Sequence, residues 1–262
     1  MSVPQNGAAA LEAVRLTKSF GGLRAASDVS FVVPHGSLTA LIGPNGAGKT
    51  TIFNLVTNFF TPDSGDVRFY GTPLAGRSPG EIAALGLVRT FQAARIFPGM
   101  TALENVLAGA HLHVRAQPWK QMLWLPGARR EERSLARRAE ALLDLAGIGR
   151  FRDAAATELP MGAQKLLEVI RALMAQPRLV LLDEPAAGLN DNETAELAAL
   201  LRAVRDSGVT VMVVEHNMSL VMGVADQVIV LDAGSVVASG TPREIQRNQR
   251  VIEAYVGQEA AA

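Results

Sequence analysis

The sequence predicts an α/β fold built on a parallel sheet, with an antiparallel β subdomain before it and an inserted α-helical subdomain. Two observations lead to this prediction. Short apolar segments typical of buried strands alternate with segments that repeat apolar residues at helical spacing, and one long stretch in the middle of the chain is helical without strands. With 262 residues, 48% of them hydrophobic, the chain is long enough to bury a sizeable core.

Five segments are short and continuously apolar or β-branched, as strands covered on both faces should be. They are LTALIG (38–43), LVRTF (87–91), LVLLD (179–183), VTVMVVE (209–215) and DQVIVL (226–231). The segments KTTIFNLVTNF, KLLEVIRALMA and DNETAELAALLRAVRD repeat apolar residues at helical spacing. This alternation indicates parallel strands joined by right-handed helical crossovers.

The remaining segments predict the two other parts of the fold. LEAVRLTKSF, DVSFVV and DVRFYG are typical of antiparallel strands, and a capping box from Thr101 to Glu104 opens the helical stretch. We therefore expect three parts. They are a flexible N-terminus at 1–10, an α/β core at 11–100 and 165–262, and a helical subdomain at 101–164.

Composition excludes several classes of function. Lysine plus arginine and aspartate plus glutamate each number 25, so the basic excess typical of nucleic-acid binding is missing. The chain has no cysteine, which rules out disulfides and thiolate metal sites, and its four histidines show no zinc-like spacing. The N-terminus has no basic head before an apolar run, and no stretch of about 18 apolar residues occurs. We expect no nucleic-acid partner, no signal peptide and no transmembrane segment.

The strongest chemical signal is GPNGAGKTT, which lies between a predicted strand and a predicted helix and satisfies G-x-x-x-x-G-K-[ST]. In such a loop the backbone N–H groups surround a phosphate, and the helix N-terminus adds the positive end of its dipole. Lys49 is expected to reach the β and γ phosphates, and Thr50 to offer its hydroxyl to Mg²⁺. A turn that merely joins strand to helix is the alternative that the full match disfavours. The predicted nucleotide-binding residues are Gly43, Pro44, Asn45, Gly46, Ala47, Gly48, Lys49, Thr50 and Thr51.

Polar residues follow three of the predicted strands. LVLLDEP ends in two acids, of which Asp183 is expected to hold Mg²⁺ through water and Glu184 to act as the general base. An acidic strand end that starts a loop is the alternative, which the phosphate loop in the same chain disfavours. Gln92 and His216 also follow strands, and open α/β sheets bind ligands at this carboxyl edge. Each alone would indicate only a structural residue, so the prediction depends on the whole set.

Taken in order, these motifs resemble the ATP-binding subunit of ABC transporters. The resemblance covers nearly the whole chain: phosphate loop, FQ at Gln92, a glycine-headed helix at 159–171, LVLLDEP, and EH at His216. It implies a P-loop NTPase with a RecA-like core. Within the family, DEPAAGLN, SLVMGVADQVIVLDAG, ASGTP and VIEAYVG are similar to the ATPases of branched-chain amino acid importers.

The resemblance implies a role for each matching residue. Phe20, in KSFGG, would stack on adenine, although a packed core aromatic is the alternative. Gln92 would monitor magnesium and the attacking water, and His216 would hold the γ phosphate. Leu159 and Gly162 belong to the signature turn, which in this family closes over the ATP bound to a second ATPase subunit, in a homo- or heterodimer.

Two positions depart from the general pattern of the family. The signature, usually L-S-G-G-Q, reads LPMGA at 159–163, so that Pro160 removes both the serine hydroxyl and a backbone N–H. Asn190 stands where the wider family often has aspartate. Both departures are expected to weaken the help that this chain gives to its partner's nucleotide.

The resemblance also implies ATP and Mg²⁺ as cofactors and several partners. Permease subunits would bind at Gln92–Met100 and a solute-binding protein would act indirectly, which places the chain peripherally at the cytoplasmic face of the inner membrane. Two alternatives stay open. The chain could power another ABC system, such as a lipopolysaccharide-type exporter, or be a nucleotide-gated interaction module with little hydrolysis. The insert with Trp119 and Trp124 is read as loop and core of the helical subdomain rather than as a surface facing lipid or a partner.

Overall fold

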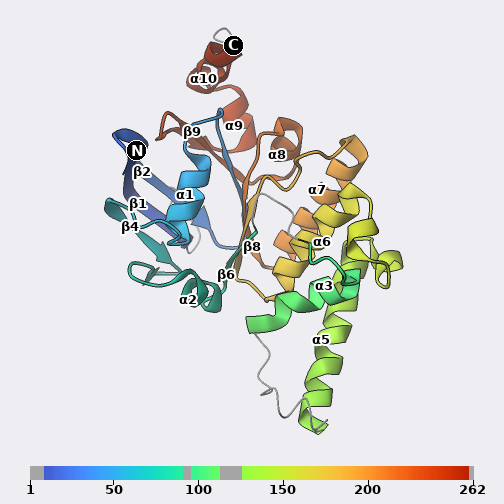
Figure 1. Ribbon diagram of the computed structural model, residues 1–262. Coiled ribbons are helices and arrows are strands. Elements are labelled where there is room, and N and C mark those ends of the chain that lie inside the picture. The colour runs from blue at the N-terminus through green and yellow to red at the C-terminus, as the bar shows by residue number, and fades with distance from the viewer. Residues whose placement is uncertain (1–8, 91–95, 113–125, 260–262) are drawn as a thin grey trace. The chain divides into compact units, whose positions relative to one another are not determined.

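The computed structural model describes residues 9–90, 96–112 and 126–259 of the chain (Figure 1). These residues divide into two compact units. The first unit comprises 1–89, 178–185 and 201–262, and the second comprises 90–177 and 186–200, within the described ranges. The segment expected to form the helical subdomain, 101–164, falls in the second unit.

A six-stranded sheet forms the centre of the first unit, with strand order β10-β9-β3-β8-β7-β6. β10 pairs with β9 antiparallel, and every other neighbouring pair is parallel, which confirms the predicted α/β fold class. β10 has only three consecutive apolar residues and is mostly half-buried, so the sequence did not predict it. The strands are β3 (Leu38–Ile42), β6 (Leu87–Arg89), β7 (Leu179–Asp183), β8 (Thr210–Val214), β9 (Gln227–Asp232) and β10 (Ser235–Gly240).

A four-stranded antiparallel sheet, in the order β2-β1-β4-β5, completes the β structure of the first unit. Its strands are β1 (Ala9–Phe20), β2 (Leu23–Pro34), β4 (Ser64–Phe69) and β5 (Thr72–Pro73). β1 begins inside the N-terminus that was expected to be flexible up to residue 10. The reason is burial, because Ala10 is fully buried and Ala9 already pairs with Pro34.

The hydrophobic core of the first unit draws its side chains from both sheets and from α1 (Lys49–Val56). Ile52, Phe53, Leu55 and Val56 of α1 are fully buried in it. Burial of each such side chain contributes about 1.5–3 kcal/mol, so α1 is held firmly at the point where the phosphate loop ends. The other helices of this unit are α2 (Pro79–Ala84), α8 (Met218–Val224), α9 (Pro242–Gln246) and α10 (Gln249–Glu259).

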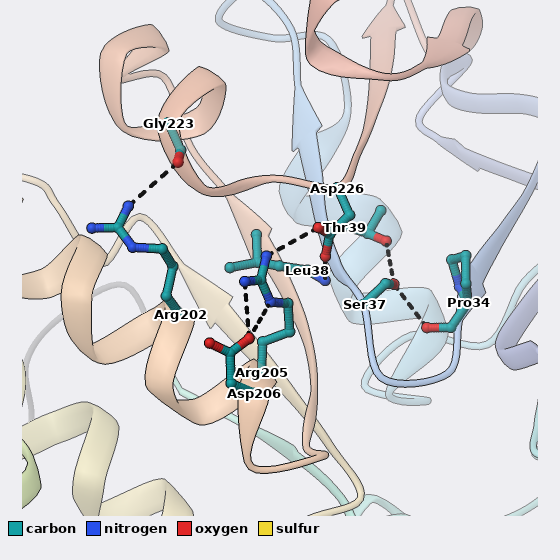
Figure 2. A network of polar contacts seen from close by, with 9 residues as sticks. All are labelled: Pro34, Ser37, Leu38, Thr39, Arg202, Arg205, Asp206, Gly223 and Asp226. Atoms are coloured by element: carbon teal, nitrogen blue, oxygen red, sulfur yellow. Dashed lines mark hydrogen bonds and ion pairs between the residues drawn. The ribbon is translucent and has the colours of Figure 1, made fainter.

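Asp226 joins the amino ends of the central strands to the end of α7 (Asp191–Asp206), as Figure 2 shows. Its carboxylate accepts hydrogen bonds from Leu38 N at 2.8 Å and from Arg205 Nη1 at 3.0 Å. The Asp226 amide in turn donates to Leu38 O at 2.8 Å. This network fixes the start of β3, whose other end leads into the phosphate loop.

The second unit is helical. Its helices α3 (Ala102–Ala108), α5 (Pro126–Leu145) and α6 (Met161–Met174) pack against one another (Figure 1). The predicted capping box is present, since Thr101 and Glu104 exchange hydrogen bonds at the start of α3. Three short 3₁₀ turns, at Gly109–Leu112, Gly149–Phe151 and Ala156–Glu158, complete the unit together with the first residues of α7. Within the described ranges, no helix combines the length and apolarity needed to cross a membrane.

Candidate nucleotide site

The carboxyl ends of three adjacent strands bring the predicted site residues to one edge of the central sheet. β8 pairs in parallel with β3 on one side and with β7 on the other. Leu41 and Asp183 both lie opposite Val214 in this register. The phosphate loop, the acids at the end of β7 and His216 after β8 therefore leave the sheet together, at the edge where parallel sheets bind ligands.

The phosphate loop has a backbone that only glycine adopts without strain at its last turn. Gly48 caps α1 with φ 99°, and a Cβ there would lie 2.4 Å from Ala25 O. A Cβ on Gly46 would meet no atom within 4 Å. The loop is thus packed tightly against the protein at Gly48 and open on the side of Gly46, which suits a loop that surrounds a phosphate.

Lys49 is buried within the loop that it follows. Its Nζ donates hydrogen bonds to Gly43 O at 2.7 Å and to Pro44 O at 2.9 Å. Burial lowers the pKa of the Lys49 amine below its ordinary value, and the negative charges of Glu184 and Asp183 oppose that shift. The structure thus brings the predicted lysine and both predicted acids into electrostatic contact.

Arg89 pairs with Asp183, a contact that the sequence does not predict. Arg89 Nη2 lies 2.8 Å from Asp183 Oδ2, and Nη1 donates to Asn54 Oδ1 of α1 at 2.6 Å. The guanidinium also lies over the ring of Phe53, 5.5 Å from its centroid. The one signal in the sequence was a charged residue inside the apolar strand LVRTF, and nothing local indicated its partner.

Glu184 adopts a backbone conformation that is unusual for a side chain of its size. Its φ is +48°, and its amide donates a hydrogen bond to Val214 O at 2.9 Å. A non-glycine residue in this region costs free energy, so such conformations persist where neighbouring structure imposes them, often at functional sites. The bend turns the chain out of β7 at the residue predicted to be the general base.

His216 is exposed, and the residue before it holds the turn in place. Glu215 is fully buried, and its Oε2 accepts hydrogen bonds from the amides of His216 at 3.1 Å and Asn217 at 3.2 Å. Asn217 then caps α8 by accepting from Leu220 N at 3.0 Å. The histidine is predicted from its place after a strand, but the buried support from Glu215 is not, because a carboxylate at a strand end is usually exposed.

Phe20 is 42% exposed, so it is not a core aromatic. Its ring meets Phe60 edge to face with centroids 5.3 Å apart, and Lys18 Nζ lies 5.6 Å from its centroid. These neighbours hold the ring while leaving part of it open to solvent. A half-exposed, oriented ring suits stacking on a flat heterocycle.

The predicted signature residues lie in the second unit, at the start of α6. Leu159 is buried, and its carbonyl accepts from Gln164 Nε2 at 2.8 Å. Pro160 occupies the N-cap position without a side-chain hydrogen bond, and the Gly162 amide donates to Glu193 Oε1 at 3.1 Å. Gln92, Trp119 and Trp124 lie outside the described residues.

The candidate magnesium ligands fit that ion. Thr50 supplies a hydroxyl on the exposed side of α1, and Asp183 supplies a carboxylate at the end of β7. Mg²⁺ prefers such oxygen donors and usually keeps several waters besides phosphate oxygens, so few protein ligands are needed. In the part of the chain that the structure describes, no group of three or more metal-ligating His, Cys, Asp or Glu side chains occurs.

A phosphate loop that heads a helix, with a buried lysine and with two consecutive acids at the end of a strand two places along the same sheet, defines a P-loop nucleotide-binding protein. A family model described as ABC transporter matches residues 26–187, and one described as Branched-chain amino acid ATP-binding cassette transporter matches residues 235–261. The chain belongs to the ATP-binding subunits of ABC transporters.

Curated relatives and solved structures agree with this assignment. The chain is 42% identical to the high-affinity branched-chain amino acid transport ATP-binding protein BraF of Pseudomonas aeruginosa, over 95% of this chain and 98% of BraF. It is 39% identical to the protein LivG of Escherichia coli, which has the same descriptive name, over 93% of this chain and 96% of LivG. The crystal structure of MJ1267, an ATP-binding cassette of an ABC transporter, in its ADP conformation matches with a TM-score of 0.82 and 30% identity, covering 95% of this chain and 99% of that one.

Proposed function

We propose that this chain is the ATP-hydrolysing subunit of an ABC importer for branched-chain amino acids. The observation that carries the catalytic part is geometric: the phosphate loop with Lys49 and the acids Asp183 and Glu184 leave the sheet at the same edge, on either side of β8. The cargo follows from the relatives, which are named for branched-chain amino acid transport, and from the matching C-terminal segment at 235–261.

The site residues divide the work of ATP hydrolysis among them. Backbone amides of 43–51 and the Lys49 amine bind the phosphates, and the Phe20 ring stacks on adenine. Thr50 and Asp183, together with Gln92, would hold a magnesium ion, which would neutralise charge on the phosphates. The oxygen of the attacking water bonds to the γ phosphorus as the bond between that phosphorus and the bridging oxygen of ADP breaks. Glu184 takes the proton that the water loses, and His216 holds the γ phosphate.

The nucleotide also controls an interface in this proposal. Leu159 and Gly162 close over the ATP bound to a second ATPase subunit, so that triphosphate joins the two subunits and its hydrolysis lets them separate. The segment from Gln92 to Met100 transmits this motion to the permease. Two of its side chains, Phe97 and Met100, are 44% and 40% exposed, which supports a role in docking.

The substitution Glu184→Gln tests the proposal. The amide keeps the shape of the side chain but cannot take the proton, so we expect ATP binding to persist, turnover to fall about 10²- to 10⁴-fold, and a nucleotide-bridged dimer to accumulate on size analysis. Glu196→Gln, an exposed change on α7, is the matched control and should behave as the unmodified chain.

Transport of the cargo is measured separately. With its permease and solute-binding partners in vesicles, the unmodified chain should drive uptake of leucine, isoleucine and valine, and the Glu184→Gln variant should not. Unchanged turnover in that variant would refute the catalytic assignment. Turnover without uptake of any of the three amino acids would refute the cargo.

A further inference from the structure

One carboxylate joins the signature turn to the loop that follows the acids of β7. Glu193, in the first turn of α7, accepts from Gly162 N through Oε1 at 3.1 Å and from Asn190 N through Oε2 at 3.0 Å. The Glu193 amide donates back to Asn190 Oδ1 at 3.0 Å. All three residues belong to the second unit. Each carboxylate oxygen therefore holds the backbone of a different segment.

The side chain of Glu193 also occupies the space that a side chain on Gly162 would need. A Cβ on Gly162 would lie 2.7 Å from both Cγ and Oε1 of Glu193 and 2.8 Å from its Cδ. A second contact joins the two segments, because a Cβ on Gly188 would lie 3.1 Å from Met161 Sδ. The absence of a side chain at 162 thus has a cause within the chain.

We propose that Glu193 is a positioning residue that makes the signature turn move together with the loop following Glu184. This inference depends on the proposed function, since it concerns the turn that is offered to the second subunit's ATP. Residues 185–190 run from Glu184 to the backbone that Glu193 Oε2 holds, and Oε1 holds Gly162. A displacement of that loop is therefore passed to the signature turn. Hydrogen bonds from amides to a charged carboxylate are among the stronger ones, which suits a rigid connection.

The contact itself is tested by a double-mutant cycle on thermal stability. Gly162→Ala should change the midpoint of unfolding less favourably in the unmodified chain than in a Glu193→Ala background. In the unmodified chain the new Cβ must displace the Glu193 carboxylate from its hydrogen bonds, whereas in the Glu193→Ala background the space is open and only the higher helix propensity of alanine acts. Equal shifts in both backgrounds would overturn the contact.

The functional role is tested in the Glu184→Gln chain, which is expected to accumulate an ATP-bridged dimer. Adding Glu193→Ala should raise the dissociation constant of that dimer about tenfold or more, the effect of losing one hydrogen bond to a charged group. Binding of ATP to the monomer should stay within about twofold, since Glu193 takes no part in the Lys49 site. Glu193→Gln, which keeps one acceptor oxygen, should recover part of the dimer affinity.

Glu196→Ala, three residues further along α7 and exposed, is the matched control and should leave the dimer unchanged. A dimer that is unaffected by Glu193→Ala, or tightened by it, overturns the positioning role. The two proposals fail separately. If the Glu184→Gln chain forms no dimer with ATP, the proposed function is wrong. If it forms a dimer whose dissociation constant does not change with Glu193→Ala, this inference is wrong.

Discussion

Arg89 donates a 2.8 Å hydrogen bond to Asp183, the carboxylate proposed to hold magnesium, so a buried cation already faces this acid in the structure. The side chains are 9% and 2% exposed, respectively. Because Arg89 also bonds to Asn54 and lies over Phe53, it connects β6 and β7 to the helix that follows the phosphate loop.

Replacing Arg89 with methionine should therefore destabilise the protein by about 3–5 kcal/mol, because the change removes the cation from a buried ion pair and leaves the Asp183 charge less well compensated. Chemical denaturation of the variant measures this loss. The control is Lys18→Met, which removes the exposed ion pair with Asp63 and should cost no more than about 1 kcal/mol. A loss at Arg89 as small as that at Lys18 would contradict the structural role.

Lys49→Ala should abolish nucleotide binding or turnover. The motif places no other cation at the β and γ phosphates, and the amine is already held in the loop by Gly43 O and Pro44 O. Titration with a fluorescent ATP analogue and a phosphate-release assay measure the two outcomes. Arg243→Ala, which removes an exposed charge on α9, should alter neither. Normal activity after Lys49→Ala would refute the site assignment.

Phe97→Asp should leave basal ATPase activity unchanged and reduce transport. The ring is 44% exposed, and the backbone around it is held by Asn105, which accepts from Phe97 N at 2.8 Å. A charge introduced there removes an apolar contact from the proposed permease surface without touching the nucleotide. Leu145→Asp, at a similarly exposed apolar position at the end of α5, should spare transport. Equal transport by both variants would count against the surface.

Pro160→Ser should raise hydrolysis at the partner's site when this chain is paired with a different ATPase that carries an intact signature. Proline lacks the hydroxyl that the family offers to the opposite γ phosphate, and one hydrogen bond to a charged group is worth roughly ten- to a hundredfold in rate. The Glu184→Gln background silences this chain's own site, so the remaining turnover reports the partner's. No gain over Glu184→Gln alone, in a heterodimer that still assembles, would mean that Pro160 only precedes the first turn of α6, at an N-cap position where a backbone N–H has no intrahelical partner.

The sequence by itself determined the parts of this protein whose residues are close along the chain. GPNGAGKTT specified the loop around a phosphate, since the glycines, the lysine and the following helix act on one another within a few residues. Asp183 and Glu184 were identified in the same way, as polar residues directly after an apolar strand. Even the sheet edge on which they meet could be predicted, because parallel strands bring their carboxyl ends together.

Only the tertiary structure decided which side chains support these residues. Arg89 reaches Asp183 because β6 lies beside β7, and Glu193 reaches Gly162 because two segments about 30 residues apart pack closely. Neither pairing follows from spacing or periodicity, because a charged side chain in the sequence gives no information about which distant partner balances it. The physical reason is burial. A charge or amide removed from water must find a hydrogen-bonding partner, and the packing of the whole chain determines which partner lies within reach.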